Sequence, residues 1–181
     1  MARTSHALVE GGRVWLVDPI EPAGLEERVL SLGEPAGVIQ LLNRHARDSA
    51  AIAMRLDVPL HVVPRELPGT TFELRPVLRN RFWREVALWW PERRVLLCAD
   101  ALGTIPFFRA GGEPIGVHPV LRFVPPRALS GLDPRHVLVG HGRGLHGDES
   151  GARVDEAIRS ARRRVPRWLL GIPRIVRQGN Q

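Results

Sequence analysis

Three apolar stretches of the sequence each end in side chains that can bind a metal ion or move a proton. The first, Gly37–Leu42, runs into the polar segment Asn43–Asp48 (NRHARD), the second ends at Asp100, and the third ends at His141, between two glycines. Imidazole nitrogens and carboxylate oxygens together suit Zn²⁺, Mn²⁺ or Fe²⁺, and such an ion can activate water for hydrolysis. One hypothesis is therefore a single-ion site with four candidate ligands: His45, Asp48, Asp100 and His141.

Alternating strands and helices are expected around these residues. Gly24–Leu32 and Ser49–Leu56 have apolar residues at helical spacing. Short apolar runs predict strands at Ala7–Val9, Arg13–Val17, Gly37–Leu42, Val58–Val63, Thr70–Val77, Trp83–Trp90, Arg94–Ala99 and Val137–Val139. This order favours an α/β layered fold, in which functional groups gather where strands end.

The second half of the sequence is less regular. Glycines and prolines predict a long loop over Ala101–Pro119, whereas Asp155–Arg164 is predicted to be a helix with an arginine-rich outer face. We interpret residues 1–164 as a single domain and residues 165–181 as a basic and apolar tail. Pro166 and Pro173 are expected to break any long amphipathic helix in that tail.

The order and spacing of the strand ends resemble the metallo-β-lactamase superfamily. The segments that carry the resemblance are Val14–Pro19 (VWLVDP), Asn43–Asp48, Cys98–Leu102 (CADAL) and Val139–Gly142 (VGHG). The resemblance implies an α/β fold that is a four-layer αββα sandwich, trimmed at the N-terminus relative to the family. It also implies hydrolase-like chemistry at a site of one or two metal ions.

The metal-binding pattern of that superfamily is degenerate here. Its first motif reads H-x-H-x-D-H, and the matching residues are Asn43, His45, Arg47 and Asp48. A further histidine of the family has no counterpart in residues 78–83, where Asn80 is the nearest polar residue. The resemblance equates Asp100 with the carboxylate that bridges the ions, and His141 with the last histidine ligand.

The change to Arg47 is the most consequential departure from the pattern. A guanidinium group is permanently charged, only donates hydrogen bonds and cannot bind a metal ion. We therefore expect Arg47 to fill the vacated metal space and to pair with Asp100 or Asp48 through parallel hydrogen bonds.

Two functional hypotheses follow. In the first, the protein has kept the fold and lost catalysis, and it binds a small anionic ligand in a pocket with a positive mouth. The arginines proposed for that mouth are Arg44, Arg47, Arg79, Arg81 and Arg84. In the second, one Zn, Mn or Fe ion remains and hydrolyses an ester, thioester, lactone or phosphoester. No serine or cysteine lies in a setting that favours a nucleophilic triad.

Composition sets broader limits on compartment and partners. The single cysteine, Cys98, excludes an internal disulfide and indicates a reducing compartment, and no signal peptide is recognised, so a bacterial, cytoplasmic protein is expected. The net charge is +7 and all basic residues are arginine, which we attribute to genome composition. A homodimer stays open as a hypothesis. Contact of the tail with nucleic acid or anionic membrane is not expected, because its prolines interrupt the amphipathic pattern.

Overall fold

Two mixed β-sheets pack face to face in the computed structural model, which describes the backbone of residues 3–179 and the side chains of residues 3–172. The first sheet has the order β1-β2-β3-β4 and contains His6–Glu10, Arg13–Val17, Glu34–Gln40 and Leu60–Val62. The second has the order β11-β10-β7-β6-β5. Its strands are β5 (Glu73–Arg79), β6 (Arg84–Trp90), β7 (Val95–Cys98), β10 (His136–Val139) and β11 (Leu145–His146).

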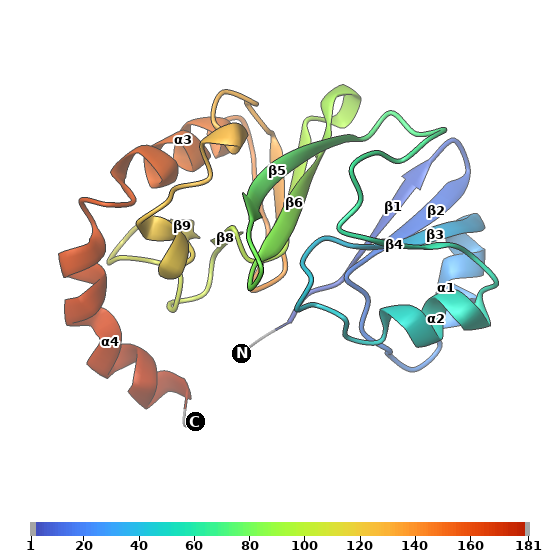
Figure 1. Ribbon diagram of the computed structural model, residues 1–181, viewed down its shortest axis with the longest axis horizontal. Coiled ribbons are helices and arrows are strands. Elements are labelled where there is room, and N and C mark those ends of the chain that lie inside the picture. The colour runs from blue at the N-terminus through green and yellow to red at the C-terminus, as the bar shows by residue number, and fades with distance from the viewer. Residues whose placement is uncertain (1–2, 180–181) are drawn as a thin grey trace.

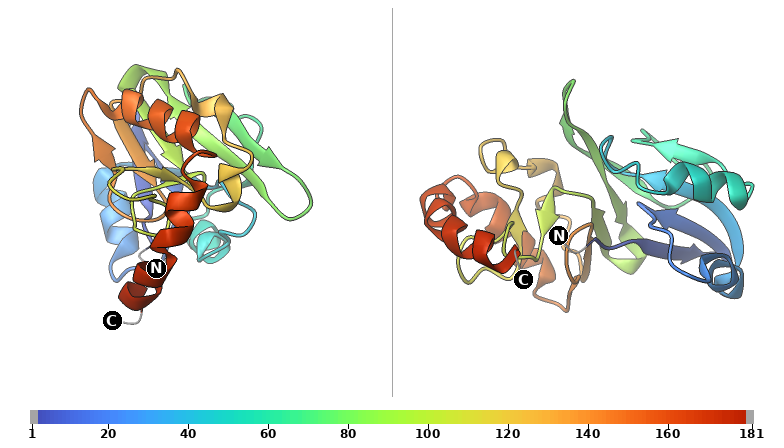
Figure 2. Two further views of the ribbon diagram at one scale, coloured as in Figure 1. Left: turned by 90° about the vertical axis from the view of Figure 1, so that its left-hand side faces the viewer. Right: turned by 90° about the horizontal axis from the view of Figure 1, so that it is seen from below.

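Helices cover the outer faces of the two sheets, so the chain forms four layers (Figure 1). Helices α1 (Leu25–Leu32) and α2 (Ser49–Arg55) pack on β3, beyond the first sheet. Helix α3 (Ser150–Ser160) lies at the opposite end of the molecule, followed by α4 (Val165–Gly179). The view from below shows the same separation of the two helical layers by the sheets (Figure 2).

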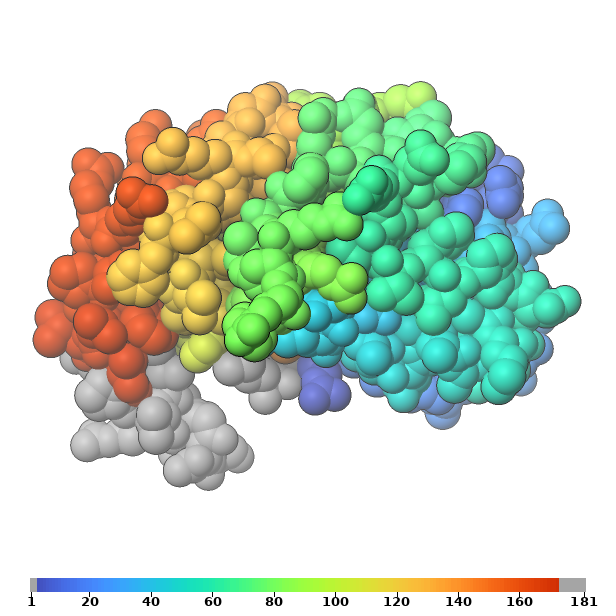
Figure 3. Space-filling view, viewed as in Figure 1, coloured from blue at the N-terminus to red at the C-terminus, as the bar shows by residue number. Residues whose placement is uncertain are grey.

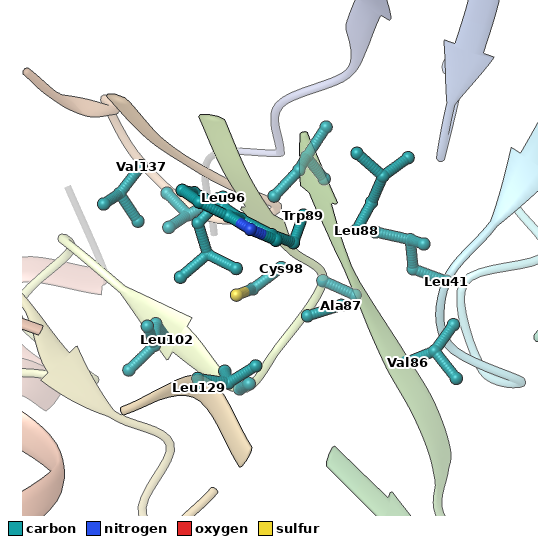
Figure 4. Close-up of a cluster of buried hydrophobic side chains, with 14 of the residues drawn as sticks. Leu41, Val86, Ala87, Leu88, Trp89, Leu96, Cys98, Leu102, Leu129 and Val137 are labelled. Atoms are coloured by element: carbon teal, nitrogen blue, oxygen red, sulfur yellow. The ribbon is translucent and has the colours of Figure 1, made fainter. Parts of the chain in front are cut away.

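Apolar side chains divide into two cores because each sheet buries both faces. A small core between the first sheet and its helices contains Val14, Leu16, Val29, Val38, Ile52 and Ala53. The larger core fills the space between the sheets and continues under α3, where Val154, Ala157 and Ile158 are buried. Cys98 lies inside this core among Leu96, Leu102 and Leu129 (Figure 4), and burial raises the pKa of its thiol, as expected for an unreactive cysteine.

Parallel pairing brings the chemically interesting strand ends to one edge. In the second sheet β7 and β10 are parallel, with Cys98 opposite Val139, so the residues that follow both strands emerge together. In the first sheet β2 and β3 are parallel, with Val17 opposite Ile39. Side chains that follow β2, β3, β7 and β10 are therefore delivered to the same end of the sandwich.

Three expectations need correction in the second half of the chain. The predicted loop at Ala101–Pro119 contains a two-stranded ribbon of β8 (Leu102–Gly103) and β9 (Gly116–Val117), too short to leave a periodic signal. Helix α3 begins at Ser150, five residues before the predicted start. The expected break in the tail is wrong, because α4 runs through Pro166 and Pro173. Pro166 falls in the first turn, where its missing N–H leaves no hydrogen bond unmade.

The remaining regular elements are short 3₁₀ turns: Pro91–Arg93, Val120–Arg122 and Arg127–Leu129. Among the described residues, none of the helices combines the length and the apolar character needed to cross a bilayer.

Candidate functional site

The strand ends bring His45, Asp100 and His141 together. Oδ1 of Asp100 lies 3.2 Å from Nε2 of His45 and 3.2 Å from Nε2 of His141. One ligand atom from each of the three residues falls within 4.8 Å of the others. His45 and Asp100 are buried, and the His141 side chain is 12% exposed. Two imidazoles and one carboxylate thus converge on a space of the size of an ion.

Asp18 holds His45 in place from behind. Its Oδ2 lies 3.1 Å from Nδ1 of His45, while its Oδ1 accepts a hydrogen bond from the Leu41 backbone N–H at 3.0 Å. Burial alone would lower the pKa of His45, but hydrogen bonds and charges from Asp100 and Asp18 outweigh it and raise the pKa to about 9. Asp18 therefore fixes the ring and leaves Nε2 for the cluster, as carboxylates behind metal-binding histidines do.

Asp100 is a buried carboxylate whose Oδ1 faces both imidazoles. The Nε2 atoms of His45 and His141 each lie 3.2 Å from this oxygen. Burial acts to raise the pKa of Asp100, but His141 and His45 outweigh it and hold the pKa well below the usual value. The group is therefore an anion, which suits it to a cation placed between the imidazoles.

Glu85 fixes the backbone that carries Asp100. Its Oε1 accepts hydrogen bonds from the N–H groups of Asp100 and Ala101 at 2.8 and 2.7 Å, and its Oε2 accepts one from Nε1 of Trp83 at 2.8 Å. Burial, aided by the charge of Asp100, raises the pKa of Glu85 to about 7, although these three hydrogen bonds oppose the shift. Sequence reasoning missed Glu85, because it stands within an apolar strand and its link to the cluster runs to Asp100, 15 residues further along the chain.

Gly140 allows the two halves of the site to approach closely. A Cβ at this position would lie 2.5 Å from the Ala99 carbonyl oxygen and 3.2 Å from Cε1 of His45. Any larger residue would push apart the segments that bear His45, Asp100 and His141. The glycine before His141 is thus explained by backbone proximity.

A cavity of about 290 Å³ opens beside the cluster. Its lining adds Arg44, Phe107, Phe108 and His118 to the three residues of the cluster. The Phe108 ring stacks on His141, with centroids 5.9 Å apart, and also contacts His118 edge-on at 5.3 Å. Aromatic rings thus form one wall, and titratable groups form the floor.

His118 was not anticipated, because it lies in the segment interpreted as a loop. It follows β9, and its ring packs edge-on against Trp83 with centroids 4.8 Å apart. Its Nδ1 accepts a hydrogen bond from the Val120 N–H at 3.3 Å, so the neutral ring carries its proton on Nε2. Burial lowers the pKa of His118 to about 4, which keeps this ring neutral at physiological pH.

Arg44 supplies a positive charge at the mouth of the cavity. Its guanidinium lies over the Trp83 ring, 4.2 Å from the centroid, and its Nη2 is 4.0 Å from Oδ2 of Asp100. The side chain is 50% exposed, so it can still contact a molecule that enters from solvent. Stacking on an aromatic ring restrains the guanidinium without using its N–H donors.

The expectation that Arg47 pairs with Asp100 or Asp48 is wrong. Its Nη1 donates to the backbone oxygens of Thr4 and Asp18 at 2.8 and 2.7 Å, and its Nη2 donates to the Gly140 oxygen at 3.3 Å. A guanidinium has five N–H donors in a plane, and three backbone carbonyls satisfy them better than one carboxylate. Arg47 therefore joins three segments of backbone and does not line the cavity that opens beside Asp100.

The other residues proposed for the site have structural contacts. Oδ1 of Asn43 accepts a hydrogen bond from the Arg84 N–H at 2.8 Å, and Oδ2 of Asp48 accepts one from the Glu21 N–H at 2.8 Å. Oδ1 of Asn80 accepts hydrogen bonds from the Phe82 and Trp83 N–H groups, in the turn between β5 and β6. In the part of the chain that the structure describes, the group that could hold an ion does not include Asp48.

The predicted ring of arginines around one pocket mouth is also wrong. Arg44 lines the cavity at the cluster, whereas Arg79 and Arg84 line a separate cavity. Arg81 stacks on Phe82, 4.1 Å from the ring centroid. Because β5 and β6 are paired antiparallel, their arginines fall on another part of the surface.

The three carbonyl contacts of Arg47 predict a stability effect. We expect Arg47→Ala to lower the free energy of unfolding by about 2 to 3 kcal/mol, since it removes charge-assisted hydrogen bonds from partly buried carbonyls. Arg47→Asp should lower the free energy of unfolding further, because it directs a carboxylate at carbonyl oxygens. It should not increase the amount of metal bound. Urea unfolding measures the first effect and metal analysis the second. Arg44→Ala is the matched control, and equal stability of the two alanine variants would contradict the assignment.

Neither a protein-family profile nor a curated protein matches the chain. Solved structures do match over most of its length. TTHA1623 in a di-iron-bound form is 20% identical with a TM-score of 0.58, covering 86% of this chain and 92% of that chain. DIM-1 metallo-beta-lactamase is 14% identical with a TM-score of 0.55, covering 86% of both chains. The flavodiiron protein from Giardia intestinalis is 12% identical with a TM-score of 0.58, covering 88% of this chain and 51% of that chain.

Proposed function

We propose that this chain, whose fold is that of the metallo-β-lactamases, binds one divalent transition-metal ion and hydrolyses a small anionic substrate. The ligands would be His45, Asp100 and His141. One observation carries the proposal: the buried Oδ1 of Asp100 lies 3.2 Å from the Nε2 atoms of both histidines. Two of the structures with a similar fold are named as a di-iron-bound form and a flavodiiron protein, but a shared fold does not by itself assign an activity.

The residues present fit a single ion rather than two. Three ligands and one open position are the usual arrangement of a catalytic zinc site, and two histidines with one carboxylate also suit Fe²⁺ or Mn²⁺. Arg47 does not obstruct this position, because its hydrogen bonds go to backbone carbonyls. The positions that would hold a second ion offer Arg47 and Asp48, and Asp48 is bonded to the Glu21 N–H instead.

Each neighbouring residue would have a defined task in hydrolysis. Lewis-acid activation of water is the chemistry that the ion supplies when bound. Asp18 orients His45 through Nδ1, and Glu85 holds the backbone of Asp100. Phe108 limits the access of bulk water to the cluster, since its ring stacks on His141.

The substrate class follows from the size and charge of the cavity. About 290 Å³ accommodates a small molecule, and Arg44 at the mouth favours a carboxylate or phosphate group on it. His118 would donate a hydrogen bond from its protonated Nε2 to a polar substrate atom. We infer that the bond broken is an ester, thioester, lactone or phosphoester.

A metal-free binding protein is the second candidate. It is favoured by the same cluster, because a protonated His45 between Asp18 and Asp100 compensates both carboxylates without an ion. In that case Arg44 would hold a small anion and no bond would be broken.

Metal analysis of the purified chain distinguishes the two candidates. We expect about one equivalent of Zn, Mn or Fe after reconstitution, and hydrolysis within a panel of small anionic esters, thioesters, lactones and phosphoesters. Arg44→Ala should raise KM about tenfold for anionic substrates and leave neutral ones unchanged, because one charge-assisted contact is lost. Arg81→Ala, which removes another arginine stacked on an aromatic ring, is the control. Protein that stays metal-free and inactive after reconstitution would favour the binding protein.

A further inference from the structure

A second cavity, of about 330 Å³, lies between the edges of the two sheets and shares no lining residue with the cavity at the cluster. It is lined by β4 and the residues after it on one side and by β5 and the start of β6 on the other. These elements lie next to each other on the face of the molecule seen in Figure 3. The volume is at the lower end of the range of about 300 to 1,000 Å³ that small-molecule sites occupy.

The wall of this cavity is apolar. Its apolar lining consists of Val62, Val63, Pro64, Leu74, Pro76, Leu78 and Val86. Val62 is 49% exposed although it faces a cavity, whereas Val86 is buried. Apolar surface of this kind gains free energy when an alkyl or aryl group covers it.

Three arginines complete the lining: Arg65, Arg79 and Arg84. All three are exposed, and in the described part of the chain none of them has a carboxylate within ion-pairing distance. Many other arginines of the chain are paired, for example Arg55 with Glu21 and Arg94 with Asp133. Three unpaired guanidinium groups around an apolar cavity therefore present positive charge to a ligand.

The one acidic residue of the lining does not cancel this charge. Glu85 is 1% exposed, and its carboxylate oxygens are engaged by Nε1 of Trp83 and the N–H groups of Asp100 and Ala101. The arginines are exposed and Glu85 is not, so a ligand would place its charge at the rim and its apolar part inside.

From this combination we infer a binding site for an amphipathic monocarboxylate with a medium-length alkyl chain. The alkyl chain covers the valines, leucines and Pro76, and the carboxylate bonds to Arg79 and Arg84. This site shares no arginine with the cavity beside Asp100, so it stands whether or not that cluster binds a metal.

Calorimetric titration with hexanoate, octanoate, octanol and octylammonium tests the inference. Affinity should rise about fourfold for each added methylene from hexanoate to octanoate. Octanoate should bind at least about tenfold more tightly than octanol, and octylammonium should not bind. Equal affinities for octanoate and octanol, or comparable binding of octylammonium, would overturn the assignment.

Variants locate the site. Arg79→Gln and Arg84→Gln should each weaken octanoate about tenfold and leave octanol unchanged. Arg28→Gln, an exposed arginine on α1, is the control and should change neither. Leu78→Trp should abolish binding of both by filling the cavity, with thermal unfolding used to confirm that the variant is folded. Unchanged octanoate affinity in the Arg79→Gln, Arg84→Gln double variant would place the binding elsewhere.

Discussion

Replacing Asp100 with alanine should abolish the metal binding that we propose for His45, Asp100 and His141. Asp100 is the only carboxylate among the three ligands grouped within the described residues, and its Oδ1 contacts both imidazoles. A structural zinc site with four ligands is worth about 10 to 16 kcal/mol, or roughly 3 kcal/mol per ligand, so affinity should fall by about two to three orders of magnitude. Competition with a fluorescent chelator measures this loss, and hydrolysis should disappear with it.

Two further variants test whether the loss of metal in Asp100→Ala is specific to the cluster. Asp18→Asn should weaken metal binding about 10- to 100-fold, because it keeps the shape of the group that orients His45 and removes its charge. Asp148→Ala removes an exposed loop carboxylate, paired with Arg135, and should have no effect. Full metal content in Asp100→Ala would show that the ion is held by other residues and would end the proposal.

The second large effect concerns stability. Glu113→Ala should lower the free energy of unfolding by about 3 to 5 kcal/mol, because it leaves a buried arginine without its counter-charge. The Arg122 side chain is 0% exposed, and its Nη2 lies 2.6 Å from Oε1 of Glu113. Oε2 of Glu113 also pairs with Nη1 of Arg164 at 2.8 Å. Urea unfolding measures the loss, and the melting temperature should fall by about 10 °C.

Glu156→Ala is the matched control for this effect. Glu156 pairs with the same Arg164, at 3.1 Å, but it is 41% exposed, so solvent screens the pair and its removal should lower the free energy of unfolding far less than Glu113→Ala. Equal losses in the two variants would contradict the role given to the buried pair. Glu113→Leu combined with Arg122→Met should recover part of the stability, because an apolar pair leaves no buried charge.

The buried pair also holds the aromatic wall of the site. Nη2 of Arg122 donates to the Phe108 carbonyl, and Glu113 accepts from the Ala110 N–H. Nε1 of Trp168, on α4, donates to the Phe107 carbonyl at 2.8 Å. The segment that closes one side of the cavity is thus fixed by residues far from it in the sequence.

The fold class could be predicted from the sequence because its signals are local. Short apolar runs, helical spacing at Gly24–Leu32 and the polar residue after each buried strand all lie within a few positions of one another. The predicted αββα sandwich is confirmed by the two packed sheets, their outer helices and the matching solved structures. The ribbon of β8 and β9 was not predicted, because two residues per strand leave no periodicity.

The site could be predicted only in part. His45, Asp100 and His141 were proposed from strand ends, and the structure brings them together, but whether they bind a metal is still a prediction. Asp18 was not proposed for the site, because its contact with His45 depends on how β2 pairs with β3. His118 reaches the cavity through a ribbon that the sequence did not indicate. Such contacts depend on tertiary packing, which no local pattern encodes.

The backbone contacts of Arg47 also limit which residues can replace it. Its guanidinium joins the oxygens of Thr4, Asp18 and Gly140, so the side chain is now part of the architecture. An acidic side chain at this position would lose these three hydrogen bonds and place its carboxylate beside carbonyl oxygens, so it would cost stability. Position 47 is therefore constrained by the fold, and a single substitution there is not expected to supply a metal ligand.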